Sequence, residues 1–213
     1  MRRFVVIGQR AHASADFSLD DLPGSSGRLD VLLRCARAAL LISHGLRQDT
    51  VVYCVLGGGA RASRTLRIDG ATARFVRPDE RSLALLAHKA LAAPASGPEF
   101  VEVRTGVSVA DGGLEWLLPQ LGEGGAFLLE EGARDVRRIA DFGPHPLFFV
   151  GDHLGFEAAA RATLSSFGVT PVGVGPVSVH AEDAITLVVN ELDRRRDPTS
   201  ELARGPEMFD KGT

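Results

Sequence analysis

The sequence has almost no lysine, cysteine, tryptophan or tyrosine, and it lacks long apolar runs. Its 213 residues include two cysteines, one tryptophan and one tyrosine. No apolar run approaches the ~18–20 residues that a membrane-spanning helix needs. The apolar run near the amino terminus, 4–7, is too short for a secretory signal and precedes no cleavage site. We therefore expect a cytoplasmic protein without a membrane segment.

The two cysteines, Cys35 and Cys54, form neither a Cys-x-x-Cys pair nor a cluster with histidine. Two reduced, buried thiols are the expected state in a cytoplasmic protein. No group of histidine, cysteine and carboxylate residues has the spacing of metal ligands. The sequence therefore predicts no metal site.

The balance of charge excludes a protein that binds nucleic acid through bulk positive charge, because the formal net charge is −3. Lys89 and Lys211 are the only lysines, so the other basic residues are arginines. The planar guanidinium suits phosphate. A GC-rich genome produces the same composition, so composition alone does not choose a function.

Short apolar runs alternate with segments of helical periodicity, which predicts an α/β fold whose mostly parallel sheet has helices on both faces. Strands are predicted at 4–7, 51–56, 75–76, 100–103, 126–129, 147–150 and 170–174. Helices are predicted at 27–43 with a stop at Gly45, from Asp79 to Leu91, and at 114–121, 157–167 and 181–195. We expect residues 1–196 to form one domain and residues 197–213, which are polar and aperiodic, to be a mobile tail.

Three predicted strand ends in the carboxyl-terminal half carry glycine: 127–130, 150–155 and 172–178. In parallel sheets ligands bind at the carboxyl ends of strands, and glycine lets a ligand approach the main chain. An apolar slot lined by backbone groups and without lysine suits an adenine ring better than a triphosphate. Ordinary strand-to-helix turns are the alternative.

Two glycine-rich segments lack the rest of a nucleotide-binding motif. The run 57–59 is not followed by the Gly-Lys-Ser/Thr of a phosphate loop, which favours a flexible turn. The pattern Gly-Val-Gly at 173–175 lacks the third glycine of a dinucleotide fingerprint. A nicotinamide site is therefore not predicted.

Several blocks of residues resemble a known family. They are Asp-Asp-Leu-Pro-Gly at 20–24, Gly-Arg-Leu-Asp-Val at 27–31, Arg-Cys at 34–35, Ser-His at 43–44, Arg-Pro-Asp-Glu-Arg at 77–81, Gly-Asp-His-Leu-Gly at 151–155, His-Ala at 180–181, Ile-Thr at 185–186 and Asn-Glu-Leu-Asp at 190–193. Together they look like the archaeal tRNA pseudouridine N1-methyltransferases of the TrmY type, in register over roughly residues 1–196.

The resemblance implies a SPOUT methyltransferase, an α/β protein with a carboxyl-terminal trefoil knot that works as a homodimer. It implies S-adenosylmethionine as methyl donor and N1 of pseudouridine in the T arm of tRNA as the acceptor. By position, the cofactor would be held by Leu129, Gly151, Gly173, Val174, Gly175, Pro176, Val177, Ser178, Val179 and Ala184. The apolar stripe of the last helix would pack across the dimer interface.

One position departs from the family. The archaeal members carry a cysteine where this chain has Ala184, beside the cofactor. This change and the mild composition favour a bacterial relative. They also leave two alternatives to the pseudouridine reaction: methylation of another RNA base, or a paralogue that binds cofactor or RNA without catalysis.

Arg28 and Asp30 lie two apart at the opening of the first helix, after a turn-rich loop. Loss of the N1 proton from pseudouridine needs an acceptor, and the charge that develops on the ring needs a cation. We expect Asp30 to act as base or orienting group and Arg28 as that cation or as a phosphate clamp. Asp79 and Arg81 are second choices. A helix start with its ordinary early carboxylate and a solvated arginine is the alternative reading.

Overall fold

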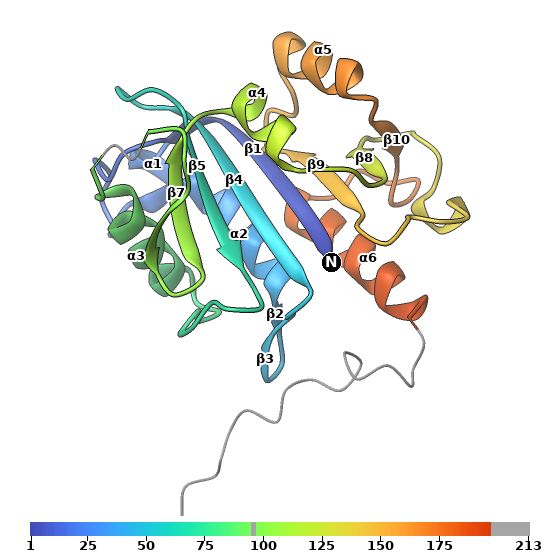
Figure 1. Ribbon diagram of the computed structural model, residues 1–213, viewed down its shortest axis with the longest axis horizontal. Coiled ribbons are helices and arrows are strands. Elements are labelled where there is room, and N and C mark those ends of the chain that lie inside the picture. Colours follow the sequence, from blue (N-terminus) through green and yellow to red (C-terminus); the bar gives the residue numbers. More distant parts are fainter. Residues whose placement is uncertain (95–96, 197–213) are drawn as a thin grey trace, which may run out of the picture.

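The computed structural model describes residues 1–94 and 97–196, and an eight-stranded mixed sheet runs through this part (Figure 1). The strand order is β10-β8-β9-β1-β4-β5-β7-β6. The strands are β1 (Arg2–His12), β4 (Thr50–Gly58), β5 (Arg64–Asp69), β6 (Val101–Arg104), β7 (Val107–Asp111), β8 (Ala126–Leu129), β9 (Leu147–Gly151) and β10 (Thr170–Val172). The five strands from β10 to β4 are parallel, and β5, β7 and β6 add an antiparallel edge.

Helices cover both faces of this sheet, as predicted. One face carries α2 (Leu29–Leu40), α3 (Glu80–Leu91) and α6 (Ala181–Arg194). The other carries shorter elements: α4 (Leu114–Leu117), the 3-10 turn η1 (Leu118–Gln120) and α5 (Ala158–Phe167). The remaining elements are α1 (Leu22–Ser25), the 3-10 turn η2 (Val136–Arg138) and a small hairpin of β2 (Leu41–Ile42) and β3 (Gly45–Leu46).

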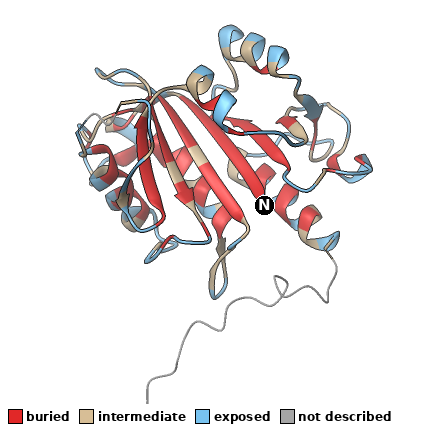
Figure 2. Ribbon diagram, in the orientation of Figure 1, coloured by how far each residue is buried: buried red, intermediate tan, exposed pale blue. Residues whose placement is uncertain are grey.

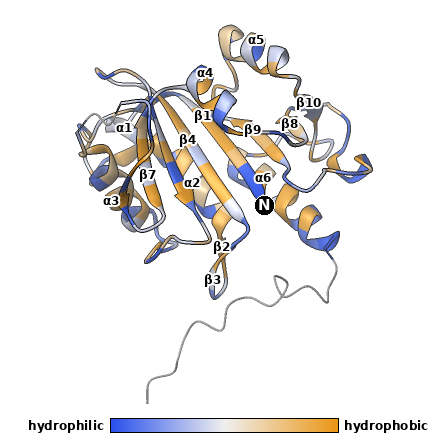
Figure 3. Ribbon diagram, in the orientation of Figure 1, coloured by the Kyte–Doolittle hydropathy of each residue, from blue (hydrophilic) through white to orange (hydrophobic). Residues whose placement is uncertain are grey.

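The central strand β1 is apolar on both sides because each side contacts a different layer of helices. Phe4 and Val6 belong to the larger core beneath α2, α3 and α6. Val5 and Ile7 belong to the smaller core beneath α4 and α5. This alternation follows from the two-residue period of a strand. Buried and apolar residues accordingly coincide along the middle strands (Figures 2 and 3).

The antiparallel edge departs from the sequence prediction. The predicted strand at 75–76 is wrong: these residues lie in a loop, and Phe75 is exposed with φ 57°. The strands β5 and β7 were not predicted. In β5 two arginines interrupt the apolar pattern, and Arg64 is nevertheless buried, because its guanidinium donates to the carbonyl oxygens of Leu91, Ala93 and Pro94.

The first long helix ends earlier than predicted. It stops at Leu40, and Gly45 lies in the β2–β3 hairpin instead of ending the helix. The predicted start of α3 is confirmed, since the Asp79 side chain accepts a hydrogen bond from the Ser82 backbone N–H at 2.8 Å. Such an N-cap satisfies a backbone donor that the helix cannot pair itself.

The expectation that the apolar stripe of α6 packs across a dimer interface is wrong. Ile185, Val188, Val189 and Leu192 are buried within one chain, where α6 lies against α2. On α6 the outward apolar residue is Leu187.

The trefoil knot stays a prediction. Its support is that the segment after β8 forms backbone hydrogen bonds with the end of β10: Gly173 N–H donates to Arg134 O, and Val136 N–H donates to Gly173 O. The predicted tail at 197–213 lies outside the described residues. Within the described residues no helix is long and apolar enough to cross a membrane.

Candidate functional site

A cavity of about 570 Å³ opens where β8, β9 and β10 end. These parallel strands finish at one edge of the sheet, and α6 begins beside them. The cavity is lined by most residues that the sequence assigned to the cofactor: Leu129, Gly151, Val174, Gly175, Pro176, Val177, Ser178, Val179 and Ala184. The sequence-based grouping of three glycine-bearing strand ends therefore corresponds to one place in the fold.

Gly173 is the one residue of that set outside the cavity lining. Its backbone pairs with the segment 134–136, and a Cβ at this position would lie 2.8 Å from Ala133 O. Its glycine is therefore explained by the close approach of two chain segments.

Charged side chains at the cavity were not predicted as site residues. Glu130 and Glu131 follow β8, Asp152 follows β9, and Arg161 lies on α5. Arg161 Nη1 donates to Glu130 Oε1 at 2.5 Å, and the Ser178 hydroxyl donates to Glu131. These contacts tie the first and third loops and α5 together around the cavity. No sequence spacing relates residues 131 and 178, so only the fold could reveal the pair.

The second loop is fixed to the end of β1. The Asp152 carboxylate accepts hydrogen bonds from the backbone N–H groups of Gln9 (3.0 Å) and Leu154 (2.8 Å). The Gln9 side chain donates to Gly155 O at 2.9 Å. A Cβ on Gly151 would lie 2.6 Å from Gly155 O, so this tight loop requires glycine there.

The lining fits S-adenosylmethionine. Leu129, Val150, Val172 and Ala184 provide an apolar slot for a ring, with backbone groups of the three loops at its edge. Glu131, whose partner is the neutral Ser178 hydroxyl, suits the positive charge of a sulfonium or an ammonium group, whereas Glu130 is already paired with Arg161. The cavity volume lies in the range typical of small-molecule sites, about 300–1,000 Å³.

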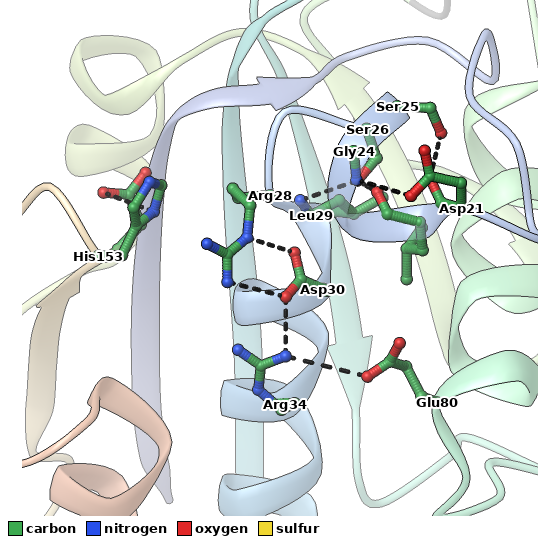
Figure 4. A network of polar contacts seen from close by, with 12 residues as sticks. Asp21, Gly24, Ser25, Ser26, Arg28, Leu29, Asp30, Arg34, Glu80 and His153 are labelled. Atoms are coloured by element: carbon green, nitrogen blue, oxygen red, sulfur yellow. Dashed lines mark hydrogen bonds and ion pairs between the residues drawn. The ribbon is translucent and has the colours of Figure 1, made fainter.

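Arg28, Asp30 and Arg34 form an ion-pair network at the start of α2 (Figure 4). Arg28 donates from Nε and Nη2 to the two oxygens of Asp30, at 3.0 and 3.1 Å. Arg34 Nη1 donates to Asp30 Oδ2 at 2.7 Å. Asp30 is buried, with 1% of its surface exposed, while part of the Arg28 side chain remains open. The sequence predicted Arg28 and Asp30 and missed Arg34.

The network fixes the charge of its members. Burial raises the pKa of Asp30, but the hydrogen bonds from Arg28 and Arg34 outweigh burial, and the net pKa is lowered. The hydrogen bond to Asp30 in turn raises the pKa of Arg28. Asp30 is therefore an ionised carboxylate whose lone pairs are engaged, which makes it a weak proton acceptor.

Backbone strain accompanies the network. Arg28 lies in the left-handed region with φ 68°, directly after Gly27 with φ 62°. At Gly27 a Cβ would lie 1.7 Å from Arg10 O, so the chain turns sharply against β1 here. A non-glycine residue in this conformation costs about 1–3 kcal/mol and is typical of functional positions.

The network extends to the wall of the cavity. Arg34 Nε donates to Glu182 Oε1 at 2.8 Å. Glu182 lies between Ala181 and Ala184, which both line the cavity. The arginine that holds Asp30 thus also holds the first turn of α6, and the two parts of the site share one support.

The second-choice residues have other contacts. Asp79 caps α3, and Arg81 pairs with Asp20 at 3.0 Å on an exposed surface.

Two histidines lie next to residues of the site. His153 is exposed, with Nδ1 4.0 Å from Asp152, and His180 occupies the N-cap position of α6. Among the described residues no three histidine, cysteine or carboxylate side chains are grouped as a metal site requires.

Comparison with known proteins identifies the family. A family model described as "Putative SAM-dependent RNA methyltransferase" matches residues 1–197. The chain belongs to this family. It is a SAM-dependent RNA methyltransferase by family, which agrees with the prediction from the sequence and with the cavity described above.

Similar proteins cover nearly the whole chain. A Methanosarcina mazei protein named tRNA (pseudouridine(54)-N(1))-methyltransferase is 40% identical over 206 residues, 96% of this chain and 97% of the relative. A Halobacterium salinarum protein of the same name is 41% identical over 195 residues, 91% of this chain and 96% of the relative. The family resemblance predicted from the motifs is thereby confirmed.

A solved structure shares the fold. Archaeoglobus fulgidus Nep1, bound to S-adenosylhomocysteine, superposes with a TM-score of 0.62 at 15% identity, covering 91% of this chain and 97% of that structure. The predicted α/β class, a mostly parallel sheet with helices on both faces, is confirmed, and the fold is that of Nep1.

Proposed function

We propose that this protein transfers the methyl group of S-adenosylmethionine to N1 of a pseudouridine in the T arm of tRNA. The observation that carries the proposal is the match, at about 40% identity and over nearly the full length of both chains, to relatives named for this reaction. The cavity and the arginine–carboxylate network supply a place and charges suited to it.

The acceptor atom explains why the base must be pseudouridine. N1 of pseudouridine carries a weakly acidic proton, whereas N1 of uridine is bonded to the sugar. When bound, S-adenosylmethionine supplies an electrophilic methyl group, and its thioether leaves as a neutral molecule. The chain therefore has to align the two reactants and to help the ring lose its N1 proton. The proton passes to a water molecule, because both oxygens of Asp30 are engaged by arginines.

We assign to Arg28 the role of stabilising the negative charge that develops on the ring, or of binding an adjacent phosphate. Its guanidinium is partly open, and the hydrogen bonds to Asp30 fix its plane. Asp30 acts as a positioning residue rather than as the base, since it is buried and its oxygens are engaged by Arg28 and Arg34. A fixed cation aimed at developing charge contributes more than a mobile one.

We assign cofactor binding to the cavity, with Leu129, Gly151, the segment 174–179 and Ala184 as contacts. Glu131, which is not ion-paired within the described residues, would lie near the positive end of the methyl donor. Ala184 cannot act as a thiol, and the mechanism proposed here does not need one.

We further propose a homodimer in the cytoplasm, where tRNA is found. Support for a partner copy is the apolar surface beside the cavity: Val177 is 71% exposed, and Val179 and Leu187 are about two-fifths exposed. A second copy that covers these residues would also close the cavity. Light scattering coupled to gel filtration tests this; a monomer at micromolar concentration would contradict it.

Methyl transfer from labelled S-adenosylmethionine, with nucleoside mass spectrometry of the product, tests the reaction. Two T-arm hairpins that differ only in uridine or pseudouridine at the target position are compared, and titration calorimetry measures cofactor binding separately. Methylation of the pseudouridine hairpin alone supports the proposal. Cofactor binding without methylation of either hairpin would contradict it and favour another RNA base or a non-catalytic paralogue.

A further inference from the structure

Phe75 is the most exposed large apolar side chain among the described residues, with 80% of its surface open to solvent. It lies in the loop between β5 and α3, and its φ of 57° is in the left-handed region. For a bulky residue this backbone conformation is an outlier. An exposed ring buries little apolar surface, and a left-handed backbone is unfavourable for phenylalanine. Stability of the fold therefore does not explain the phenylalanine at this position.

The Phe75 ring is half of an aromatic–arginine pair. The Arg104 guanidinium lies over one face of the ring, 5.5 Å from its centroid. Arg74 and Arg77, on the same loop, are exposed, and within the described part of the chain no hydrogen bond or ion pair engages them or the Arg104 side chain. Asp69 is occupied by Arg67 at 2.6 Å and Glu102 by the Gly106 N–H at 2.7 Å. Asp79 accepts from the Ser82 N–H at 2.8 Å, and the charge of Arg77 acts on it only at longer range.

The pair is held in place by close backbone packing. Gly106, in the β6–β7 turn, lies so near the loop that a Cβ would be 2.1 Å from Ala73 N. Asp69 N–H donates to Gly106 O at 2.9 Å, and Ala73 N–H donates to Asp69 O at 2.7 Å. The loop that carries Phe75 and the turn that follows Arg104 are thus fixed to each other, and the open face of the ring has a defined direction.

We propose that Phe75 and Arg104 form a stacking platform for an unpaired base of the RNA substrate, with Arg74 and Arg77 contacting phosphates. This inference rests on the proposed function only in taking RNA as the substrate. Aromatic rings and guanidinium planes are the surfaces on which proteins stack unpaired bases. RNA is favoured over a protein partner because Arg74, Arg77 and Arg104 bring three positive charges to the surface around this one ring, which suits a polyanion.

The platform lies far from the cavity. Arg104 of the pair lies on β6, at one edge of the sheet, and the cavity lies at the ends of β8, β9 and β10, near the other edge. Of these three strands β9 is nearest to β6, and five strand spacings separate the two. At about 4.8 Å each, these spacings amount to roughly 24 Å. Within one chain, the base that stacks on Phe75 is therefore not the base methylated at that chain's cavity, and the platform is a separate RNA contact.

The test compares RNA binding by four proteins: the wild type, Phe75→Asn, Phe75→Tyr and Leu85→Gln. Asparagine tolerates the left-handed backbone but cannot stack, tyrosine keeps the ring, and Leu85 is an exposed apolar control on α3. Binding to a whole tRNA is measured by fluorescence anisotropy. We expect Phe75→Asn to weaken it by about 5- to 100-fold, and Phe75→Tyr and Leu85→Gln to stay within twofold.

Thermal stability separates a binding role from a structural one. Phe75→Asn should leave the melting temperature unchanged or raise it by up to about 4 °C, because it relieves backbone strain. Arg74→Gln and Arg77→Gln should each lower the slope of log Kd against log salt by about 0.7–0.9, because each removes one phosphate contact. Whole-tRNA binding by Phe75→Asn within twofold of wild type, or a fall in both stability and binding, would overturn the proposal.

These outcomes are independent of the methylation assay. Weaker RNA binding by Phe75→Asn together with no methylation by the wild type would leave the platform standing and the proposed reaction rejected. Methylation by the wild type with unchanged binding by Phe75→Asn would reject the platform alone.

Discussion

Arg34 donates from Nε to Glu182 at 2.8 Å and so joins α2 to the first turn of α6. The same guanidinium holds Asp30 through Nη1 at 2.7 Å. One side chain thereby sets the position of the carboxylate that orients Arg28 and of the helix that borders the cavity.

Asp30→Asn should abolish most of the activity while leaving the cofactor bound. The amide cannot neutralise two arginines or accept from both of them in the same way, so Arg28 loses its fixed plane. We expect kcat to fall by about 100-fold or more, the scale of losing one preorganised charged group. Single-turnover methyl transfer measures the rate, and calorimetry should give a dissociation constant for S-adenosylmethionine within threefold of wild type. Asp20→Asn, an exposed carboxylate paired with Arg81, is the matched control. Near-normal activity of Asp30→Asn would remove Asp30 from the mechanism.

The same variant should change how stability depends on pH. Because the folded-state pKa of Asp30 is lowered below its ordinary value, its ion pairs stabilise the protein above a pH of about 4, the pKa of an unfolded aspartate. That contribution is lost as the pH falls through the lower folded-state pKa. Melting temperatures between pH 3 and 7 should therefore differ most between wild type and Asp30→Asn at pH 7, and least at pH 3. A difference in melting temperature that stays constant between pH 3 and 7 would show that the negative charge of Asp30 does not stabilise the fold.

Ala184→Cys should leave methyl transfer within about threefold of wild type, since the proposed mechanism uses no thiol. Ala184→Leu should instead prevent cofactor binding, because the longer side chain enters the cavity that Ala184 lines. Calorimetry and the methylation assay measure both effects. A large gain of activity in Ala184→Cys over an inactive wild type would favour the non-catalytic paralogue.

Gly151→Ala should destabilise the loop that follows β9. Its Cβ would lie 2.6 Å from the Gly155 carbonyl oxygen, a backbone atom held by Gln9 at 2.9 Å. We expect the melting temperature to fall by roughly 3–10 °C, from an overpacking cost of about 1–3 kcal/mol in a protein of this size. Gly113→Ala is the control, because its Cβ meets the Ser63 side chain at 3.2 Å. Equal melting temperatures for the two variants would contradict the backbone clash.

Neither thiol should react in the native protein. Cys35 and Cys54 are buried and unpaired with each other, as the sequence predicted. Burial raises the pKa of Cys54 to about 12, and burial is also the main reason for the raised pKa of Cys35. A thiol reagent at pH 8 should titrate two groups in denaturant and none within minutes in buffer. Rapid native labelling would indicate that the core beneath α2 opens.

Most of the fold could be predicted from the sequence because its central strands are buried on both faces. The runs that became β1, β4, β8 and β9 are continuously apolar, which periodicity detects. The antiparallel edge could not be predicted from the sequence, because Arg64 interrupts the apolar pattern of β5. Its burial depends on carbonyl oxygens of residues 91–94, which are distant in sequence. Conversely, two adjacent apolar residues at 75–76 resembled a strand but occupy a loop.

In the candidate site, too, contacts between residues close in sequence could be predicted, and contacts between residues distant in sequence could not. Glycine after each of three strands pointed to one ligand, because parallel strands end together. Arg34 could have been found from its spacing of four residues from Asp30 along a helix. Glu182 and Arg161 could not, since each meets its partner through contacts that only the folded sheet creates.

The position of β1 at the middle of the sheet has a consequence for synthesis on the ribosome. This strand is made before both of its neighbours, and one of them, β9, begins only at Leu147. The residues that line the cavity all come later than residue 128. Until β9 has been made, β1 therefore lacks one of its two parallel neighbours, and S-adenosylmethionine could stabilise the chain only after Ala184 has been added.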